Sequence, residues 1–329
     1  MKKSYRSVLS TSCFFIFLAA PFTAHAQDAE KTAPLWKKGI YHESVPQPTF
    51  KDVRYGEQHR NVLDFWQAPS EEPTPVVISI HGGGWNGGNK AQLDSFVNAR
   101  ELLKAGISIV SIHYRFIKHC KDLDPPVLGP LTDAARAVQF VRSKADEWNI
   151  DKTRIAATGG SAGACTSLWL AYHDDLADPE SKDPVAREST RLRCVAAIRA
   201  QTTLDPKQMK AWIPNSKYGA HAFGIKSFDQ FLADRDSILP LINKYSPYAL
   251  LDAEDPETYL FFTVAPAVGK EERDPTHSAV FGVELQKRCK KLGVRCELAY
   301  PGAKNVQHKN PTEYLIATLV DETNNRDEK

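Results

Sequence analysis

The sequence predicts an α/β protein with a mostly parallel central sheet of about eight strands, helices on both faces and a small cap. Short runs rich in β-branched residues, such as Val76–Ile80, alternate with amphipathic segments such as Leu131–Trp148. This alternation is typical of parallel strands connected by helices that cover both faces of the sheet. The chain has 329 residues, of which 42% are hydrophobic, so it is long enough to bury a substantial core.

The elements are predicted in chain order from apolar periodicity and from glycine and proline breaks. Residues 53–66 predict an edge hairpin that ends in a strand. An ion pair between Arg115 and Asp133, or a solvated helix face there, is expected at the start of the long helix. The other expected strands lie at 107–114, 155–158, 195–200, 259–264 and 296–300, and the other helices at 96–104, 164–172, 277–292 and 312–320.

Residues 1–26 predict a signal peptide. Three basic residues precede a short apolar run, and Ala24-His25-Ala26 is a typical cleavage site. We therefore expect cleavage after Ala26 and an exported chain, periplasmic or secreted. The apolar run is shorter than the roughly 20 residues of a spanning helix, so no stable membrane anchor is expected after cleavage. The chain that remains has 39 basic and 40 acidic residues, which gives no indication of nucleic-acid binding.

The rest of the chain is expected to form one domain, residues 51–325, after an extended, proline-containing linker at 27–50. Residues 205–257 interrupt the strand–helix alternation and hold several aromatic side chains. We interpret this excursion as a cap that forms one wall of a pocket, with ordinary surface helices as the alternative.

A candidate nucleophile lies between a predicted strand and a predicted helix. Residues 159–163, Gly-Gly-Ser-Ala-Gly, match the G-x-S-x-G pattern of a nucleophile elbow. A strand that turns directly into a helix holds the residue at the bend in a strained conformation and exposes its side chain. The helix N-terminus that follows Ser161 favours negative charge. A glycine and serine loop without catalytic function is the alternative.

A run of glycines follows the strand at 76–80. In His81-Gly82-Gly83-Gly84-Trp85, consecutive backbone amides can turn outward and bind an anion. The pattern is that of an oxyanion-hole loop. We expect the amides of Gly83, Gly84 and Ala162 to form the oxyanion hole. His81 is expected to anchor the loop and not to act as a base.

A serine nucleophile requires a base and an orienting acid. His308 is the favoured base, because the chain order serine, acid, histidine places the base in the loop after the last strand. His277 is the alternative, although it is interpreted more readily as a residue at a helix N-terminus.

The acid is expected in the loop at 265–275 that follows the preceding strand. Asp274 is favoured because Asp274-Pro275 opens the next helix, and Glu271 and Glu272 remain alternatives in the same loop. Asp205 is a further candidate because it also follows a strand end.

Five cysteines remain after cleavage, and Cys289 and Cys296 are close enough in the chain to pair. No C-x-x-C motif is present, so neither a zinc site nor a redox motif is indicated, and no cofactor or metal is expected.

Together these motifs resemble the α/β-hydrolase superfamily, in particular its branch of hormone-sensitive-lipase-like and bifunctional feruloyl/acetyl-xylan esterases. The resemblance implies a carboxylic ester hydrolase that acts through an acyl-enzyme on small-molecule or polysaccharide-linked esters, such as acetyl or feruloyl esters. The alternatives are a serine peptidase of the same fold and a catalytically silent binding protein. The matching segments are 81–85, 114–115, 154–155, 160–163, 274–275 and 300–308.

Overall fold

The computed structural model describes residues 39–320, and the strands in this range form one eight-stranded sheet. The strand order is β1-β2-β4-β3-β5-β6-β7-β8, and only the pairs β1–β2 and β2–β4 are antiparallel. The predicted fold class is therefore confirmed. The strands are β1 (Phe50–Arg54), β2 (Val62–Trp66), β3 (Thr74–Ile80), β4 (Ser108–Ile112), β5 (Ile150–Gly160), β6 (Cys194–Ile198), β7 (Glu257–Phe261) and β8 (Cys296–Ala299).

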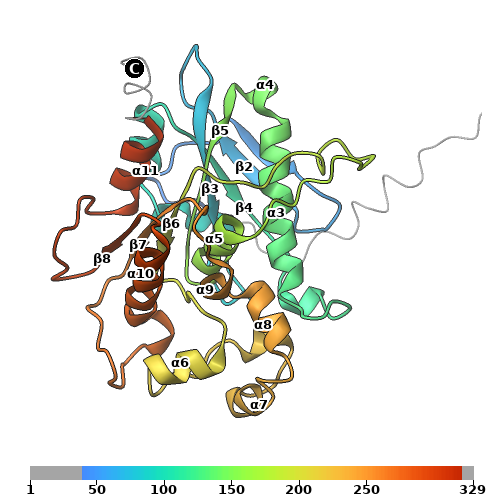
Figure 1. Cartoon of the computed structure of the whole chain (residues 1–329). Coiled ribbons are helices and arrows are strands. Elements are labelled where there is room, and N and C mark those ends of the chain that lie inside the picture. The colour runs from blue at the N-terminus through green and yellow to red at the C-terminus, as the bar shows by residue number, and fades with distance from the viewer. Residues whose placement is uncertain (1–38, 321–329) are drawn as a thin grey trace, which may run out of the picture. The chain divides into compact units, whose positions relative to one another are not determined.

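Helices connect the parallel strands, as Figure 1 shows. The α-helices are α2 (Ala99–Lys104), α3 (Leu128–Ser143), α4 (Ala145–Trp148), α5 (Ala162–Tyr172), α6 (Pro206–Trp212), α7 (Phe228–Ala233), α8 (Leu239–Tyr245), α9 (Pro247–Leu250), α10 (Val280–Leu292) and α11 (Pro311–Val320). The short 3-10 helices are η1 (Lys90–Ser95), η2 (Ile117–His119), η3 (Ala220–Phe223) and η4 (Pro275–His277).

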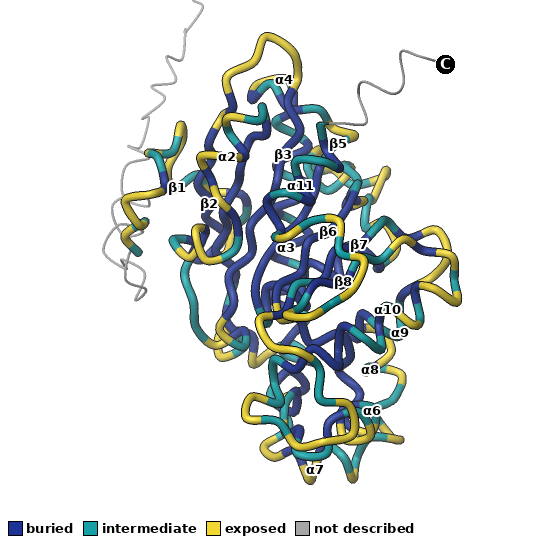
Figure 2. The backbone as a smooth tube through the Cα atoms, turned by 90° about the vertical axis from the view of Figure 1, so that its left-hand side faces the viewer, coloured by how far each residue is buried: buried dark blue, intermediate teal, exposed yellow. Residues whose placement is uncertain are grey.

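Two apolar clusters cover the two faces of the sheet. Alternate residues of β3 take opposite sides, so that Ile78 joins the larger cluster and Val77 the smaller one. The larger cluster includes side chains of α3, α5 and α10, whereas the smaller includes side chains of α2 and α11. Figure 2 shows the strands as the buried centre between these layers.

The described part of the extended linker expected at residues 27–50 contacts the sheet. In its described part, Val45 is buried and the hydroxyl of Tyr41 donates to the carboxylate of Asp64 at 2.7 Å. The indole N–H of Trp66 donates to the carbonyl of Pro46 at 2.8 Å. Residues 39–49 are thus packed against β2, because the side chain of Tyr41 and the backbone of Pro46 satisfy polar groups of that strand. The predicted signal peptide lies outside the described residues.

The excursion between β6 and β7 contains α6, η3, α7, α8 and α9. In both Figure 1 and Figure 2, α6, α7 and α8 gather together beyond one end of the strands. Because α6 starts shortly after the last residue of β6, this is the carboxyl end of the parallel sheet. Within residues 39–320, no helix has both the length and the apolar character needed to cross a bilayer.

The carboxyl ends of three central strands lie level with one another. Ile80 at the end of β3 pairs with Gly159, and Gly160 at the end of β5 pairs with Ile198. The loops that follow β3, β5 and β6 therefore leave the sheet side by side. In parallel sheets this edge is where ligands bind.

Candidate active site

Ser161 occupies a strained turn between β5 and α5. Its φ of 54° is unusual for a residue with a Cβ atom. Its backbone N–H donates to the carbonyl of Ile198 at 2.9 Å, which ties the turn to β6. The predicted elbow is therefore present, and the serine side chain emerges at the carboxyl edge of the sheet, directly before the N-terminus of α5.

The turn is possible because glycines allow three backbone segments to meet. A Cβ atom on Gly163 would lie 2.0 Å from the carbonyl oxygen of Ile80, and one on Gly159 would lie 2.3 Å from the same oxygen. Real Cβ atoms do not approach backbone oxygens so closely. Both glycines of the motif are thus required by packing between α5, β3 and β5.

His277 and Asp274 complete a chain of hydrogen bonds with the serine. The Nε2 of His277 lies 2.9 Å from the Oγ of Ser161, and its Nδ1 lies 2.7 Å from the Oδ2 of Asp274. A carboxylate only accepts hydrogen bonds, so Nδ1 carries the proton and Nε2 is left to accept from the serine hydroxyl. This is the arrangement that an acid, a base and a serine nucleophile require.

The turn that carries both residues is held by buried polar contacts. His277 ends η4, and its backbone N–H donates to the carbonyl of Asp274 at 3.2 Å. The buried amide of Gln201, from the loop after β6, donates to the carbonyl of Thr276 at 2.6 Å. Glu272 accepts from the hydroxyl of Ser278 on the other side of the turn. The position of the imidazole is therefore set by the loop after β6 as well as by its own turn.

The glycine loop after β3 faces the serine across a cavity of about 440 Å³, which we call the serine pocket. Gly83 and Gly84 have φ values of 105° and 59°, which only glycine adopts without strain. The indole N–H of Trp85 donates to the hydroxyl of Thr166 on α5 at 3.0 Å, so the loop is attached to the helix that follows the serine. The lining of the pocket includes Gly83, Gly84, Ser161, Arg199, Tyr218 and His277.

His81 is buried beneath the glycine loop. Its ring stacks on Tyr114 with 4.2 Å between centroids, and its Nδ1 lies 2.8 Å from the carbonyl of Gly82. Burial lowers the pKa of His81 to about 3, so the ring is neutral at ordinary pH. The expectation that His81 anchors the loop is confirmed by these contacts.

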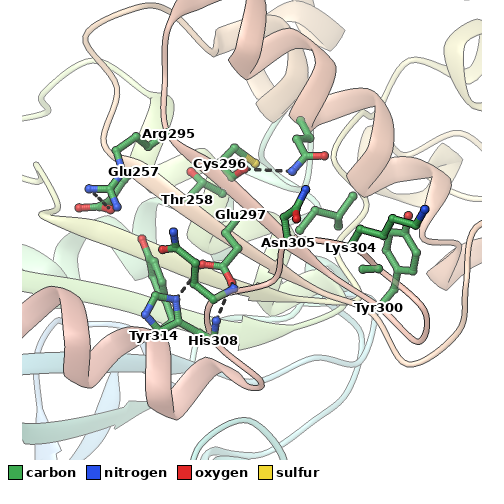
Figure 3. A pocket seen from close by; sticks show the side chains of 14 residues that line it. Glu257, Thr258, Arg295, Cys296, Glu297, Tyr300, Lys304, Asn305, His308 and Tyr314 are labelled. Atoms are coloured by element: carbon green, nitrogen blue, oxygen red, sulfur yellow. Dashed lines mark hydrogen bonds and ion pairs between the residues drawn. The ribbon is translucent and has the colours of Figure 1, made fainter.

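The structure does not bring His308 to the serine, so the expectation that it would lie there as the base is wrong. The Nδ1 of His308 lies 2.7 Å from the Oε2 of Glu297, in a separate cavity of about 460 Å³ (Figure 3). Glu297 pairs in register with Tyr259, two residues before the carboxyl end of β7. The loop after β8 thus folds back along β8 itself, which is an edge strand of the sheet. β8 lies three strands, or roughly 14 Å, from β5.

The contacts of the four acid candidates show which of them can orient the imidazole of His277. Asp274 is the carboxylate that contacts the histidine of the serine pocket, as expected. Asp205 caps the N-terminus of α6 and pairs with Arg235 at 2.6 Å, so its proposed alternative role is excluded by its position. Glu272 is occupied by Ser278, and no described contact joins Glu271 to the imidazole. Among residues 39–320, no group of three or more His, Cys, Asp and Glu side chains could hold a metal ion.

The ion pair expected between Arg115 and Asp133 is present. Asp133 accepts from the guanidinium of Arg115 at 2.8 Å and from its backbone N–H at 2.7 Å, which confirms the ion pair.

The five cysteines of the described chain are free thiols. The sulfur atoms of Cys289 and Cys296 nevertheless interact, and this hydrogen bond is the main cause of a lowered pKa of Cys289.

The favoured base is wrong because the signal that identifies the alternative, His277, is local. Asp274 and His277 are three residues apart, and Pro275 between them favours the first turn of a helix. A three-residue separation on such a turn brings the two side chains together. No motif includes Arg199, and only the folding of distant segments brings it to the pocket, where it joins Tyr218, one of the aromatic side chains of the excursion at 205–257.

Comparison with known proteins gives matches over much of the chain. A profile of the BD-FAE family matches residues 63–266. LipM of Mycobacterium tuberculosis, a probable carboxylic ester hydrolase, is 33% identical over 149 residues, which are 43% of this chain and 32% of LipM. A probable isoprenylcysteine alpha-carbonyl methylesterase of Oryza sativa is 31% identical over 162 residues, 48% of this chain and 36% of the relative. The chain thus spans about a third of the length of these relatives.

Solved structures resemble nearly all of the described chain. A truncated carbohydrate esterase from gut microbiota has a TM-score of 0.62 at 18% identity and covers 88% of this chain and 99% of its own. An acetyl ester-xyloside bifunctional hydrolase from Caldicellulosiruptor lactoaceticus has a TM-score of 0.55 at 21% identity, with 81% and 87% covered. At such identities the likeness establishes the fold, which is that of an α/β-hydrolase.

Proposed function

Since the chain belongs to the BD-FAE family, we propose that it is a serine carboxylic-ester hydrolase that works through an acyl-enzyme. The observation that carries this proposal is the continuous hydrogen-bond chain from Asp274 through His277 to Ser161. Ser161, at the end of this series of hydrogen bonds, lies opposite a glycine loop that lines the same pocket. A nucleophile, its base and a set of backbone donors are the parts that acyl transfer requires.

In the proposed first step, Nε2 of His277 takes the proton of the Ser161 hydroxyl while Oγ attacks the ester carbonyl. The imidazolium that forms donates through Nδ1 to Asp274, which stabilises its charge. His277 then gives the proton to the oxygen of the leaving alcohol. Water then attacks the acyl carbon while Nε2 takes its proton, and Nε2 gives this proton to Oγ of Ser161 as the acid leaves.

The negative charge on the former carbonyl oxygen needs donors that are already in place. We assign this role to the backbone amides of Gly83, Gly84 and Ala162. Gly83 and Gly84 line the pocket, and Ala162 is the first residue of α5, so its amide has no partner within the helix. The dipole of α5 adds a partial positive charge at the same point.

For substrates, we propose short acyl esters or acyl groups carried on carbohydrate. Two structural relatives are described as a carbohydrate esterase and an acetyl ester-xyloside hydrolase, which supports this class. Tyr218 lines the pocket from the helical excursion, where an aromatic ring can contact either a sugar or an acyl chain.

The proposal is tested by comparing wild type and Ser161→Ala on p-nitrophenyl acetate, acetylated xylan, methyl ferulate and a peptide amide. We expect hydrolysis of one or more of the esters by wild type, and a loss of several orders of magnitude in kcat in the variant without a change in fold. A fluorophosphonate probe should label wild type at Ser161. Unchanged ester hydrolysis in Ser161→Ala would refute the mechanism, and cleavage of the amide alone would favour a peptidase.

We also propose that the protein is exported and cleaved after Ala26, on the basis of the amino-terminal sequence. The test is the intact mass of the protein recovered from the envelope or the medium of an expressing bacterium. A chain that starts at Gln27 is expected, and a chain that retains Met1 would contradict the proposal.

A further inference from the structure

We propose that Arg199 makes the serine pocket select esters that carry a carboxylate close to the bond that is cleaved. This inference rests on the proposed ester hydrolase function and names a substrate class within it. It starts from an unusual backbone conformation beside the serine and from a pocket lining that, within the described residues, holds no acidic side chain.

Arg199 directly follows β6 and adopts a left-handed conformation with φ of 51°. Its backbone N–H donates to the carbonyl of Phe261 at 2.8 Å, which extends the pairing of β6 with β7 by one residue. Asparagine or glycine adopts such a conformation at lower cost than arginine. A strained residue of this kind beside an active site points to a function for its side chain.

The backbone contacts of the neighbouring residue bring Arg199 close to the nucleophile. Ile198, the preceding residue, accepts the hydrogen bond from the backbone N–H of Ser161. Arg199, Ser161 and His277 line the same pocket of about 440 Å³. A group bound by the guanidinium therefore lies within the length of one small ester from the reacting carbonyl.

No acidic side chain belongs to the described lining of this pocket, where Arg199 and His277 are the ionisable groups apart from tyrosine. Asp205, the next carboxylate along the chain after Arg199, is held by Arg235, and Asp274 beside the pocket is engaged by His277. Within residues 39–320 no ion pair holds the Arg199 guanidinium, and its side chain is exposed.

Other arginines of the same chain behave differently. Arg115 is held by Asp133, and Arg235 is held by Asp205. These pairs show that acidic partners are available where an arginine has a structural role. A guanidinium without such a partner retains its full set of donors, whose planar geometry matches both oxygens of a carboxylate.

The carboxylate can belong to the acyl group, as in a half-ester of a dicarboxylic acid, or to the alcohol, as in an ester of a hydroxy acid or uronic acid. The shared chemistry is an anionic group beside the ester, and two pairs of substrates separate the sources. On the acyl side, p-nitrophenyl hydrogen adipate is compared with p-nitrophenyl hexanoate. On the alcohol side, 4-acetoxybenzoate is compared with 4-acetoxybenzamide.

The measured quantity is the ratio of kcat/KM for the anionic ester to that for its neutral partner. We expect a ratio above one in at least one pair for wild type, and a ratio lower by about tenfold or more in Arg199→Gln. Arg199→Lys keeps the charge and should retain part of the preference. Lys291→Gln, which removes an exposed charge on α10, is the matched control and should keep the wild-type ratio.

Two outcomes overturn the inference: a wild-type enzyme that hydrolyses neutral esters without preferring either anionic one, and a preference that survives in Arg199→Gln. Absence of hydrolysis of all four esters by wild type counts against the ester hydrolase itself, so the two failures are distinguishable. Should Arg199→Gln not fold, the wild-type ratio is measured between low and high salt. A bound carboxylate predicts that the ratio falls as salt screens the guanidinium, and a constant ratio contradicts it.

Discussion

Asp274 and His277 hydrogen-bond to each other within a single 3-10 turn, with 2.7 Å between Oδ2 and Nδ1. The acid and the base therefore come from one short segment, and only one long-range approach, that of Nε2 to the Oγ of Ser161, completes the chain of hydrogen bonds. The acid is more exposed to solvent than the base, since the side chain of Asp274 is 58% exposed and that of His277 is 24% exposed.

The pairs His277–Asp274 and His308–Glu297 predict opposite effects of mutation. His277→Ala removes the base and should lower kcat by roughly 10⁴-fold or more. His308→Ala should leave kcat close to wild type and lower the free energy of unfolding by about 1–3 kcal/mol, because Glu297 loses its partner. Ester hydrolysis and urea unfolding of both variants check this. The assignment fails if His308→Ala is the inactive variant.

The exposure of Asp274 predicts a modest role for the acid. Asp274→Asn should lower kcat by about 10–100-fold, less than the roughly 10⁴-fold typical of a buried acid, because water screens the interaction with the imidazolium. Glu297→Gln is the control and should not lower kcat. A loss in Asp274→Asn as large as that in His277→Ala would show that the carboxylate is shielded from solvent during turnover.

The close packing of backbone around Gly163 predicts that a side chain at this position destabilises the protein. In Gly163→Ala the new methyl group would lie 2.0 Å from the carbonyl oxygen of Ile80 and 2.7 Å from that of His81. We expect the free energy of unfolding to fall by about 3 kcal/mol or more, because backbone on both sides must move. Gly293→Ala, where φ is 79° and no atom lies within 4 Å of the new methyl group, should cost only about 1–2 kcal/mol. Equal losses in urea unfolding would contradict the steric account.

The raised pKa of Asp255 predicts that the free energy of unfolding depends on pH. Burial is the largest cause that raises its pKa from 3.8 to about 6 in the folded protein. The folded state therefore holds the proton more tightly than the unfolded state, and the stabilisation present below about pH 4 is lost as pH rises to about 6. Asp255→Asn stays neutral, so it should exceed wild type by about 1–3 kcal/mol at pH 8 and approach it near pH 4.

The measurement for Asp255 is the free energy of urea unfolding between pH 4 and pH 8. Glu254→Gln, an exposed neighbour, is the control and should show no such divergence from wild type. A constant difference between Asp255→Asn and wild type across this range would mean that ionisation of Asp255 is not its cause.

The α/β fold, the serine and the glycine loop are determined by short stretches of sequence. Val76–Ile80 cannot favour a helix, and the strand at 155–160 must turn sharply where Gly159 and Gly163 admit neighbouring backbone. The ion pair of Arg115 with Asp133 and the position of Asp274 in the acid loop also follow from local order along the chain. Such features depend on residues that are neighbours in sequence or on consecutive elements.

Long-range packing selects the histidine that meets Ser161 and brings Arg199 to the lining of the same pocket. His308 and His277 both follow strands at the same end of the sheet, and the path of each loop depends on packing that no single stretch specifies. The loop after β8 folds back so that His308 meets Glu297, whereas Gln201 holds the turn of His277 beside the serine. The sequence determines the chemistry of each side chain, but Ser161 and His277 are 116 residues apart and meet only through the packing of the segments that carry them.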